Sequence, residues 1–252
     1  MTHPHDRVER ERQFHDSLIR EGHNTIATKE WWETPGGKVR FARRISLLNA
    51  ACANLITPPQ RARVLVVGCG EGEWINAISD FAEVAGIDIS PEIITRVGSQ
   101  LRNITDARVE VGDAHQLRFA DESFDICFAN STLHHLDLQI ALPELHRVLR
   151  SGGLLIAGEP NRTNPQVWWM YRFSRNRSRY GLTPDEEAFS RKSIHNLLCQ
   201  YFCKVSVSPF DFWHPALGHT DSNGCLFRFL QSIERVPIVR SLAGSLWIVA
   251  EK

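Results

Sequence analysis

The sequence lacks an excess of either charge and has no long apolar run. Lys and Arg total 29 and Asp and Glu total 29, so the net charge at pH 7 is zero. That balance argues against nucleic acid as the main partner, although it leaves room for a local basic patch. No apolar run approaches the roughly 18 residues that cross a bilayer. The polar start Met-Thr-His-Pro-His-Asp is not a signal segment, so we expect neither a spanning nor a secretory element.

Cysteine is sparse and scattered. The six cysteines form neither a disulfide framework nor the paired spacing of a zinc site. His214 and His219 also lack a carboxylate or cysteine ligand at a suitable spacing. We therefore expect no metal, and a cytoplasmic protein with reduced thiols. At 252 residues and 42% hydrophobic content, the chain is expected to form one core-bearing domain with extensions.

The most informative stretch that is present is an apolar run ending in glycines. Val64-Leu-Val-Val leads into Gly68, Gly70 and Gly72. Such a run predicts a buried strand that turns sharply into a helix, where glycine accepts positive φ and lets a ligand approach the backbone. About 20 residues after Gly68, a second apolar run ends in Asp88, a position suited to hydrogen-bonding ribose hydroxyls. Together these features predict a pocket for a nucleoside-containing cofactor.

Three later segments continue the alternation of strands and helices. Val109–Ala114 predicts a third strand that ends in an acidic residue, and Asp121–Asn130 predicts a turn and a fourth strand. Leu142–Ala157 predicts a helix followed by a fifth strand. The glycine spacing is not that of a dinucleotide fingerprint, and no Gly-Lys-Ser/Thr of a Walker loop is present. The alternation predicts a doubly wound α/β sheet with ligands at the carboxyl ends of its strands.

Between Arg61 and Asn161, the order of the motifs resembles the class I S-adenosylmethionine-dependent methyltransferases of the small-molecule type. The motifs are Val-Gly-Cys-Gly-Glu-Gly, Gly-Ile-Asp-Ile-Ser, Gly-Asp-Ala, Ser-Phe-Asp-Ile and Leu-Arg-Ser-Gly-Gly. Val66 departs from the pattern, because that family often has an acidic residue two positions before the first glycine. The resemblance implies the Rossmann-like methyltransferase fold, a mostly parallel seven-stranded sheet whose last strand is antiparallel and lies beside the sixth.

Residues 1–60 are expected to form an N-terminal helical cap. Arg7–Arg20 predicts an amphipathic helix, Gly36-Gly37 a break in the chain, and Phe41–Leu55 a second helix. We hypothesise that this segment, with its Trp31-Trp32 pair, folds over the cofactor, because methyl transfer gains from excluding water and fixing geometry. The alternative is a helix packed permanently against the sheet edge.

Residues 61–252 are expected to form the methyltransferase domain. Insertions are expected after the fifth and sixth strands, at about 162–189 and 211–244. The C-terminal elements are predicted as a helix over Ser190–Phe202 and strands over Lys204–Ser208 and Leu246–Ala250.

The resemblance implies S-adenosylmethionine as cofactor and assigns its contacts to the first four strand tips. The glycine turn would meet the amino-acid end of the cofactor, and the first acidic tip would take the ribose hydroxyls. The second acidic tip would meet the adenine amino group. A simple turn or cap is the alternative role for either acid. The implied contacts are Gly68, Gly70, Asp88, Ile89, Asp113, Ala114 and Asn130.

Two histidines follow the fourth strand, at the rim where catalysis is expected. His134 or His135 could accept a proton from a hydroxyl acceptor near neutral pH. The alternative is that they only cap the next helix or line the cofactor pocket. Asn161, at the end of the fifth strand, could orient an acceptor, although Glu-Pro-Asn also makes an ordinary turn.

Acceptor specificity is expected in the insertions. Pro165–Phe173 concentrates four aromatics and a methionine, and Arg172–Arg179 contains four arginines. Trp168 and Arg172 are therefore candidates for binding an amphipathic, anionic acceptor, while an anionic membrane surface or RNA are other candidate partners. A solvated loop with inward-packed aromatics is the alternative. The amphipathic stretch Leu226–Val236 predicts a lid, a dimer contact, a membrane-facing helix or an ordinary packing helix.

We expect S-adenosylmethionine-dependent methyl transfer to a small or lipophilic metabolite, with a hydroxyl oxygen as the leading acceptor atom. N- or C-methylation is the alternative within enzymes, and a cofactor-fold binding protein without turnover is the alternative outside them. The sequence identifies neither the acceptor nor the oligomeric state. Peripheral membrane contact remains a candidate property.

Overall fold

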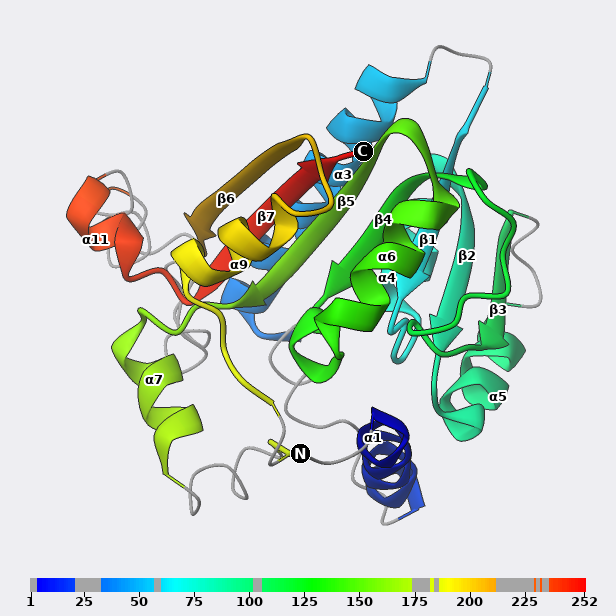
Figure 1. Ribbon diagram of the computed structural model, residues 1–252, viewed down its shortest axis with the longest axis horizontal. Helices are drawn as coiled ribbons and strands as arrows, with labels where there is room; N and C mark the ends of the chain where they lie inside the picture. Colours follow the sequence, from blue (N-terminus) through cyan, green and yellow to red (C-terminus); the bar gives the residue numbers. More distant parts are fainter. Residues whose placement is uncertain are drawn as a thin grey trace.

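A single mixed sheet forms the centre of the computed structural model, which describes residues 4–20, 33–56, 60–101, 106–173, 182–183, 186–211, 229, 232 and 236–252. Its strand order is β3-β2-β1-β4-β5-β7-β6 (Figure 1). Strand β7 runs antiparallel to both of its neighbours, and the other pairs are parallel. This confirms the predicted doubly wound, Rossmann-like methyltransferase fold. The strands are β1 (Ala62–Val67), β2 (Ala82–Asp88), β3 (Ala107–Val111), β4 (Phe124–Asn130), β5 (Leu149–Pro160), β6 (Lys204–Phe210) and β7 (Ser245–Glu251).

Helices cover both faces of the sheet (Figure 1). One core joins Val64 and Val66 of β1 to Ile75 of α4, and it also receives side chains of α3 and α5. The other core joins Leu65 of β1 to Leu142 of α6 and receives side chains of α9. The helices are α1 (Pro4–Arg20), α3 (Pro35–Leu55), α4 (Glu73–Ser79), α5 (Pro91–Gln100), α6 (Leu138–Val148), α7 (Pro165–Arg172), α9 (Arg191–Leu198) and α11 (Pro237–Ser241), with a 3-10 turn η1 (Leu133–His135).

Burial on both faces explains why β1 reads as a continuous apolar run. Val64 and Leu65 point to opposite faces of the sheet, and both side chains are fully buried. A central parallel strand has no solvent face, so it needs no alternation of polar residues. Truncating one such leucine to alanine typically costs about 2–5 kcal/mol. The strand therefore holds the glycine turn at its carboxyl end in a fixed position.

The predicted break at Gly36-Gly37 is wrong, because both glycines lie inside the first turn of α3. Thr34 caps this helix: its side-chain oxygen accepts a hydrogen bond from the Gly37 N–H at 3.0 Å. Pro35 occupies the first turn, where a missing N–H costs nothing. These capping interactions outweigh the low helix propensity of glycine. The helix therefore begins six residues earlier than Phe41.

Helix α3 is tied to the end of β6 by a buried ion cluster. Asp211 is fully buried, and its carboxylate lies 2.7 Å from Arg44, 3.3 Å from Arg40 and 3.5 Å from Arg43. Burial lowers the pKa of Arg44 to about 10, although the charge of Asp211 opposes that shift. Removing one partner of a buried ion pair would leave the other charge buried without a counter-charge, which is strongly destabilising. The cluster therefore fixes α3 on the sheet.

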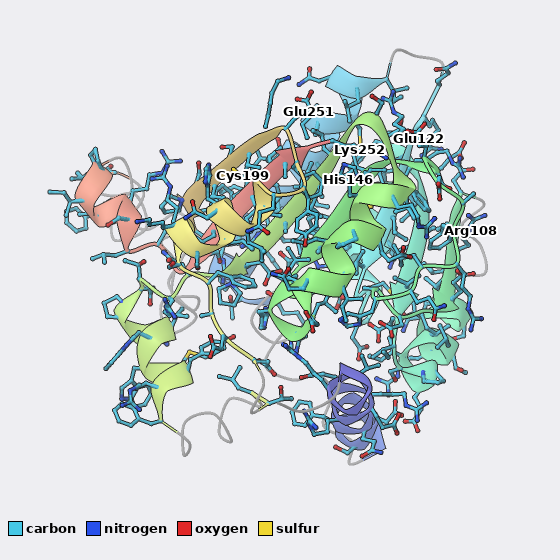
Figure 2. The ribbon with its side chains drawn as sticks, in the orientation of Figure 1. Arg108, Glu122, His146, Cys199, Glu251 and Lys252 are labelled. Atoms are coloured by element: carbon cyan, nitrogen blue, oxygen red, sulfur yellow. The ribbon has the colours of Figure 1, made fainter. Side chains whose placement is uncertain are left out.

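The carboxyl-terminal residues lie at the edge opposite the strand tips that bear the predicted motifs. Lys252 donates a hydrogen bond to the carbonyl of Leu149 at 2.7 Å and lies 3.7 Å from the Glu122 carboxylate (Figure 2). Among the described helices, none has the length and apolar character needed to cross a bilayer. The Trp31-Trp32 pair, His214, His219 and most of Leu226–Val236 lie outside the described residues.

Candidate functional site

A cavity of about 230 Å³ opens at the carboxyl ends of β1, β2, β3 and β4. Helix α1 lies beyond these strand tips and contributes Val8 and Glu11 to the wall (Figure 1). All seven residues predicted to contact the cofactor line this cavity. The remaining lining residues are Val67, Cys69, Glu71, Glu73, Trp74, Ile87, Ile93, Gly112, His115, Ser131, Thr132, His135 and Leu136.

The glycine turn exposes bare backbone to this cavity. Gly68 and Gly70 have φ values of +66° and +50°, which L side chains rarely adopt. A Cβ at Gly68 would also lie 2.6 Å from the side chain of Thr132. Both the backbone angle and the close approach therefore require glycine at this position.

Asp88 ties the tip of β2 to the glycine turn. One carboxylate oxygen accepts a hydrogen bond from the Gly70 N–H at 3.1 Å, and the other accepts from the Ser90 N–H at 3.1 Å. The residue is nearly buried and still lines the cavity, as does the adjacent Ile89. A carboxylate offers about four lone-pair sites, so it can accept more than these two hydrogen bonds.

Asp113 is paired with His115, which the sequence analysis missed. The Asp113 carboxylate accepts from the His115 backbone N–H at 2.9 Å and lies 2.6 Å from its Nδ1. Nε2 of His115 accepts from the Asp137 N–H at 2.9 Å. The Nδ1 of this imidazole therefore carries the proton and donates it to Asp113. With Ala114 between them, these residues build the wall beyond β3.

Glu159 anchors the segment that follows β4. One of its carboxylate oxygens accepts the N–H groups of Thr132 at 3.0 Å and Leu133 at 2.9 Å. The other lies 2.7 Å from Nδ1 of His134. Glu159 is 1% exposed, so these bonds are formed in a dry environment, where they are strong. They fix the peptide that runs from Asn130 to the two histidines.

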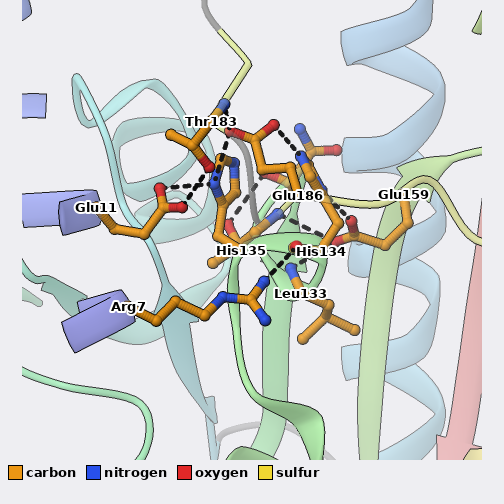
Figure 3. A network of polar contacts seen from close by, with 10 residues as sticks. Arg7, Glu11, Leu133, His134, His135, Glu159, Thr183 and Glu186 are labelled. Atoms are coloured by element: carbon orange, nitrogen blue, oxygen red, sulfur yellow. Dashed lines mark hydrogen bonds and ion pairs between the residues drawn. The ribbon is translucent and has the colours of Figure 1, made fainter. Parts of the chain in front are cut away.

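His134 and His135 belong to a buried cluster with three glutamates, which we call the histidine cluster: Glu11, His134, His135, Glu159 and Glu186 (Figure 3). His135 Nδ1 lies 3.1 Å from the Glu11 carboxylate and 3.5 Å from that of Glu186. His134 Nε2 lies 3.7 Å from the Glu186 carboxylate. His135 lines the cavity, whereas His134 is buried behind it. The two predicted proton acceptors therefore occupy different environments.

The neighbouring glutamates raise the pKa of His135. Burial by itself would lower its pKa, but the Glu11 hydrogen bond and the negative charges of Glu186, Glu11 and Glu159 outweigh burial and raise it. The imidazolium form is thus stabilised relative to a free histidine. His134, His135 and Glu186 also bring one potential ligand atom each within 4.8 Å of one another, a spacing compatible with a small cation.

Helix α1 is attached to the site through polar contacts that no local sequence pattern reveals. Arg7 donates a hydrogen bond to the His134 carbonyl at 3.0 Å (Figure 3). Glu11 accepts from the Thr183 hydroxyl at 2.6 Å, and Asp16 accepts from the Ser90 hydroxyl at 2.6 Å. The amphipathic pattern predicted the helix, but these partners lie far away in the sequence. The contacts place α1 directly over the cavity.

The three predicted acceptor residues lie outside the cavity lining. The Asn161 side chain donates to the carbonyls of Ser241 at 3.1 Å and Ala243 at 2.7 Å, so it joins two segments of the chain. Trp168 and Arg172 are exposed on α7. On the same helix, the ring of Tyr171 has its centroid 6.4 Å from that of His134. Helix α7 thus borders the histidine cluster rather than the cavity itself.

Comparisons with known proteins agree with this geometry. Residues 65–157 match the family model described as a methyltransferase domain. The chain is 33% identical over 115 residues to a demethylmenaquinone methyltransferase of Staphylococcus aureus, covering 43% of this chain and 48% of that protein. It spans less than half the length of the curated relatives it matches.

Solved structures share the fold at low sequence identity. A Thermotoga maritima protein described as an SAM-dependent methyltransferase and possible histamine N-methyltransferase has a TM-score of 0.62 at 18% identity, covering 95% of this chain and 99% of its own. The CurJ carbon methyltransferase has a TM-score of 0.66 at 17% identity, covering 94% of this chain and 60% of its own. At such identities the likeness extends to the fold alone.

Proposed function

We propose that this chain, in which residues 65–157 form a methyltransferase domain of the class I fold, transfers the methyl group of S-adenosylmethionine to a small or lipophilic metabolite. One observation carries the proposal. The glycine turn and the acidic tips of β2 and β3, which are far apart in the sequence, line one cavity at the carboxyl edge of the sheet. That edge is where doubly wound sheets bind their ligands.

The cavity residues fit the parts of the cofactor in order. In the proposal, backbone at Gly68 and Gly70 meets its amino-acid end, and Asp88 accepts the ribose hydroxyls. Asp113 and Ala114 meet the adenine amino group and ring edge, Ile89 packs on the adenine, and Asn130 lies near the methionine portion. The cofactor supplies an activated methyl group, so the protein contributes binding and orientation.

The acceptor is proposed to be a hydroxyl group that loses its proton to the neutral form of His135, and because the glutamates raise the pKa of His135, this form gains population toward alkaline pH. Bound S-adenosylmethionine would supply the activated methyl group and would be released as S-adenosylhomocysteine, while His135 would take the proton that the hydroxyl loses. The position of His135 in the cavity wall supports this role. Glu11 and Glu186 hold the ring, while His134, bonded to Glu159, supports the peptide behind it. N- or C-methylation is the alternative, and it needs no such proton acceptor at the moment of transfer when the acceptor is already nucleophilic.

A lipophilic acceptor is proposed on two grounds. The matched Staphylococcus aureus protein is a demethylmenaquinone methyltransferase. Helix α7, which borders the histidine cluster, also exposes apolar side chains of Trp168, Trp169 and Phe173. Tyr171 of this helix has its ring 6.4 Å from that of His134, which in turn lies 4.2 Å from the His135 ring, so an acceptor that arrives along α7 would come close to the proposed base.

Two measurements on the same preparation test the proposal. Calorimetry with S-adenosylhomocysteine measures cofactor binding, and release of S-adenosylhomocysteine from S-adenosylmethionine reports turnover. A screen of hydroxylated amphipathic metabolites, with amine and carbon acceptors beside them, is expected to give turnover with a hydroxyl compound. Cofactor binding without turnover across all three classes would favour a non-catalytic binding protein. Absence of cofactor binding would overturn the assignment of the cavity.

A further inference from the structure

Helices α7 and α11 leave large apolar side chains in solvent. Helix α7 buries none of its residues, and Trp168 is 49% exposed. At α11, Ile238 is 80% exposed. These residues belong to a set that we call the α7–α11 surface, whose six members are each more than a third exposed: Trp168, Trp169, Phe173, Val236, Ile238 and Leu242.

Two asparagines hold the helices of this surface together. Asn164 caps α7 and donates a hydrogen bond to the Leu242 carbonyl at 2.7 Å. Asn161, just before it, donates to the carbonyls of Ser241 and Ala243. The end of α11 is therefore fixed to the beginning of α7, although about 80 residues separate them in the chain. Both helices lie at the end of the sheet formed by β5, β7 and β6, away from β3 (Figure 1).

The charged residues of helices α7 and α11 are all positive. Arg172 ends α7 and Arg240 lies in α11, and both are exposed. Neither helix contains an acidic residue. Among the described residues, Arg172 and Arg240 thus place positive charge on the two helices that carry these exposed apolar side chains.

This combination fits the surface of a bilayer better than other partners. Tryptophan prefers the level of lipid headgroups, because its ring is apolar and its N–H is polar. Arginines beside it are attracted to anionic lipids. Several large apolar side chains exposed on neighbouring elements indicate an interaction site more often than ordinary surface. An RNA partner would be bound by the arginines and by stacking on the tryptophans. The exposed aliphatic side chains of Ile238 and Val236 would contribute nothing to RNA binding.

We propose that the α7–α11 surface docks on the headgroup region of an anionic lipid bilayer. The ring of Tyr171 on α7 has its centroid 6.4 Å from that of His134, so the docked helix borders the histidine cluster. A bilayer-embedded acceptor would then reach the catalytic rim without crossing water. This last step rests on the proposed methyl transfer, whereas docking does not.

Vesicle sedimentation of the full chain tests the proposal. The probes are phosphatidylcholine vesicles with and without roughly one-third phosphatidylglycerol, which supplies the negative surface. The wild-type chain is expected to bind the anionic vesicles, and Trp168→Ser with Trp169→Ser is expected to weaken partitioning roughly tenfold or more. Arg172→Gln and Arg240→Gln are expected to weaken it roughly fivefold each. Leu47→Ser is the matched control, because Leu47 is 41% exposed on α3 and carries no such role.

Unchanged circular dichroism and S-adenosylhomocysteine affinity establish that each variant is folded. No binding of the wild-type chain to anionic vesicles would overturn the proposal, as would equal loss of binding in Leu47→Ser. A dimer that the double tryptophan variant dissociates, without vesicle binding, would identify a second copy of the chain as the occupant instead. Vesicle binding without turnover on any acceptor would contradict methyl transfer and leave docking intact. Turnover without vesicle binding would refute docking alone.

Discussion

The carboxylate of Glu11 lies 3.1 Å from Nδ1 of His135, although 124 residues separate them in the chain. This contact joins the first helix to the wall of the cavity at the proposed proton acceptor. Glu11 also accepts a hydrogen bond from Thr183, so three distant segments converge on one side chain. The proposed base is therefore completed only when α1 is docked. If α1 closes over the cofactor, as we propose, closure and completion of the base would be one event.

The first prediction concerns Glu11→Gln and the pH dependence of stability. The pKa of His135 is raised above its ordinary value of 6.5 in the folded chain. A raised folded pKa gives stability that is fully present below the unfolded pKa and is lost as pH rises through the folded pKa. Glu11→Gln is expected to lower the folded pKa, because Glu186 and Glu159 remain but the nearest charge is gone. The variant should be less stable than the wild type near pH 6, and the difference should shrink toward alkaline pH.

Urea unfolding between about pH 5.5 and about pH 9 measures this difference. Glu9→Gln is the control, since Glu9 lies on the same helix and pairs with exposed Arg12 instead. A gap between Glu11→Gln and wild type that stays constant across pH would show that Glu11 acts on stability without acting on His135.

The second prediction concerns Asp88→Ala. It should weaken S-adenosylhomocysteine binding by about 1.5–3 kcal/mol, the scale of a hydrogen bond involving a charged group, which corresponds to roughly 10- to 150-fold. Calorimetry measures the affinity. Asp80→Ala is the control, because Asp80 is exposed at the end of α4. Since Asp88 also bonds the Gly70 and Ser90 N–H groups, Asp88→Asn and thermal unfolding separate a ligand role from a structural one. Unchanged affinity in Asp88→Ala would mean that the ribose assignment is wrong.

The sequence predicted correctly those elements whose structure is determined by the residues of a single short segment. The buried strands appear as apolar runs because both faces of β1 are covered, and the positive φ values of Gly68 and Gly70 require glycine. It failed at Gly36-Gly37, where the Thr34 cap and Pro35 outweighed glycine propensity. Reading propensity without the cap produced that error.

Contacts between distant segments were beyond the reach of sequence patterns. Nothing near His135 indicates that its partners are Glu11 and Glu186. Likewise, Asn161 sits at the expected strand end, but its side chain bonds carbonyls about 80 residues later. The local sequence around Asn161 would be the same whether this residue stabilises a turn or binds an acceptor. Only its tertiary contacts distinguish the two roles.

The third prediction concerns movement of α1. If this helix closes over the cofactor, its amides should exchange hydrogen more slowly with S-adenosylhomocysteine bound than without it. The physical reason is that Val8 and Glu11 line the cavity, so a ligand adds contacts to the closed state. Hydrogen exchange across residues 10–45 measures the effect, with β7 as an internal reference far from the cavity. Equal protection in both states would exclude a cofactor-responsive lid and favour permanent packing.

The fourth prediction concerns metal removal. His134, His135 and Glu186 have the spacing of a small cation site, but imidazole–carboxylate pairing also accounts for their approach. We expect turnover to be unchanged after treatment with a chelator, and elemental analysis of the purified chain to find no stoichiometric metal. Activity that is lost on chelation and restored by zinc would contradict the role of His135 as a free proton acceptor.

The last prediction separates acceptor binding from cofactor binding. Trp168→Ala or Arg172→Ala should impair turnover while leaving S-adenosylhomocysteine affinity nearly intact. The reason is spatial: the cavity is built from the ends of the first four strands and α1, whereas both residues lie on α7, outside its lining. Steady-state rates against acceptor concentration, beside calorimetry of each variant, measure the two effects.

The two variants are expected to remain as stable as the wild type, so that a loss of turnover can be assigned to acceptor binding. Because both side chains are exposed, their removal should change the free energy of unfolding by no more than about 0.5 kcal/mol. Leu47→Ala, at an exposed apolar position on α3, is the control for loss of surface area. Loss of both cofactor affinity and stability in Trp168→Ala would mark the tryptophan as part of the core, and unchanged turnover in both variants would remove α7 from the acceptor site.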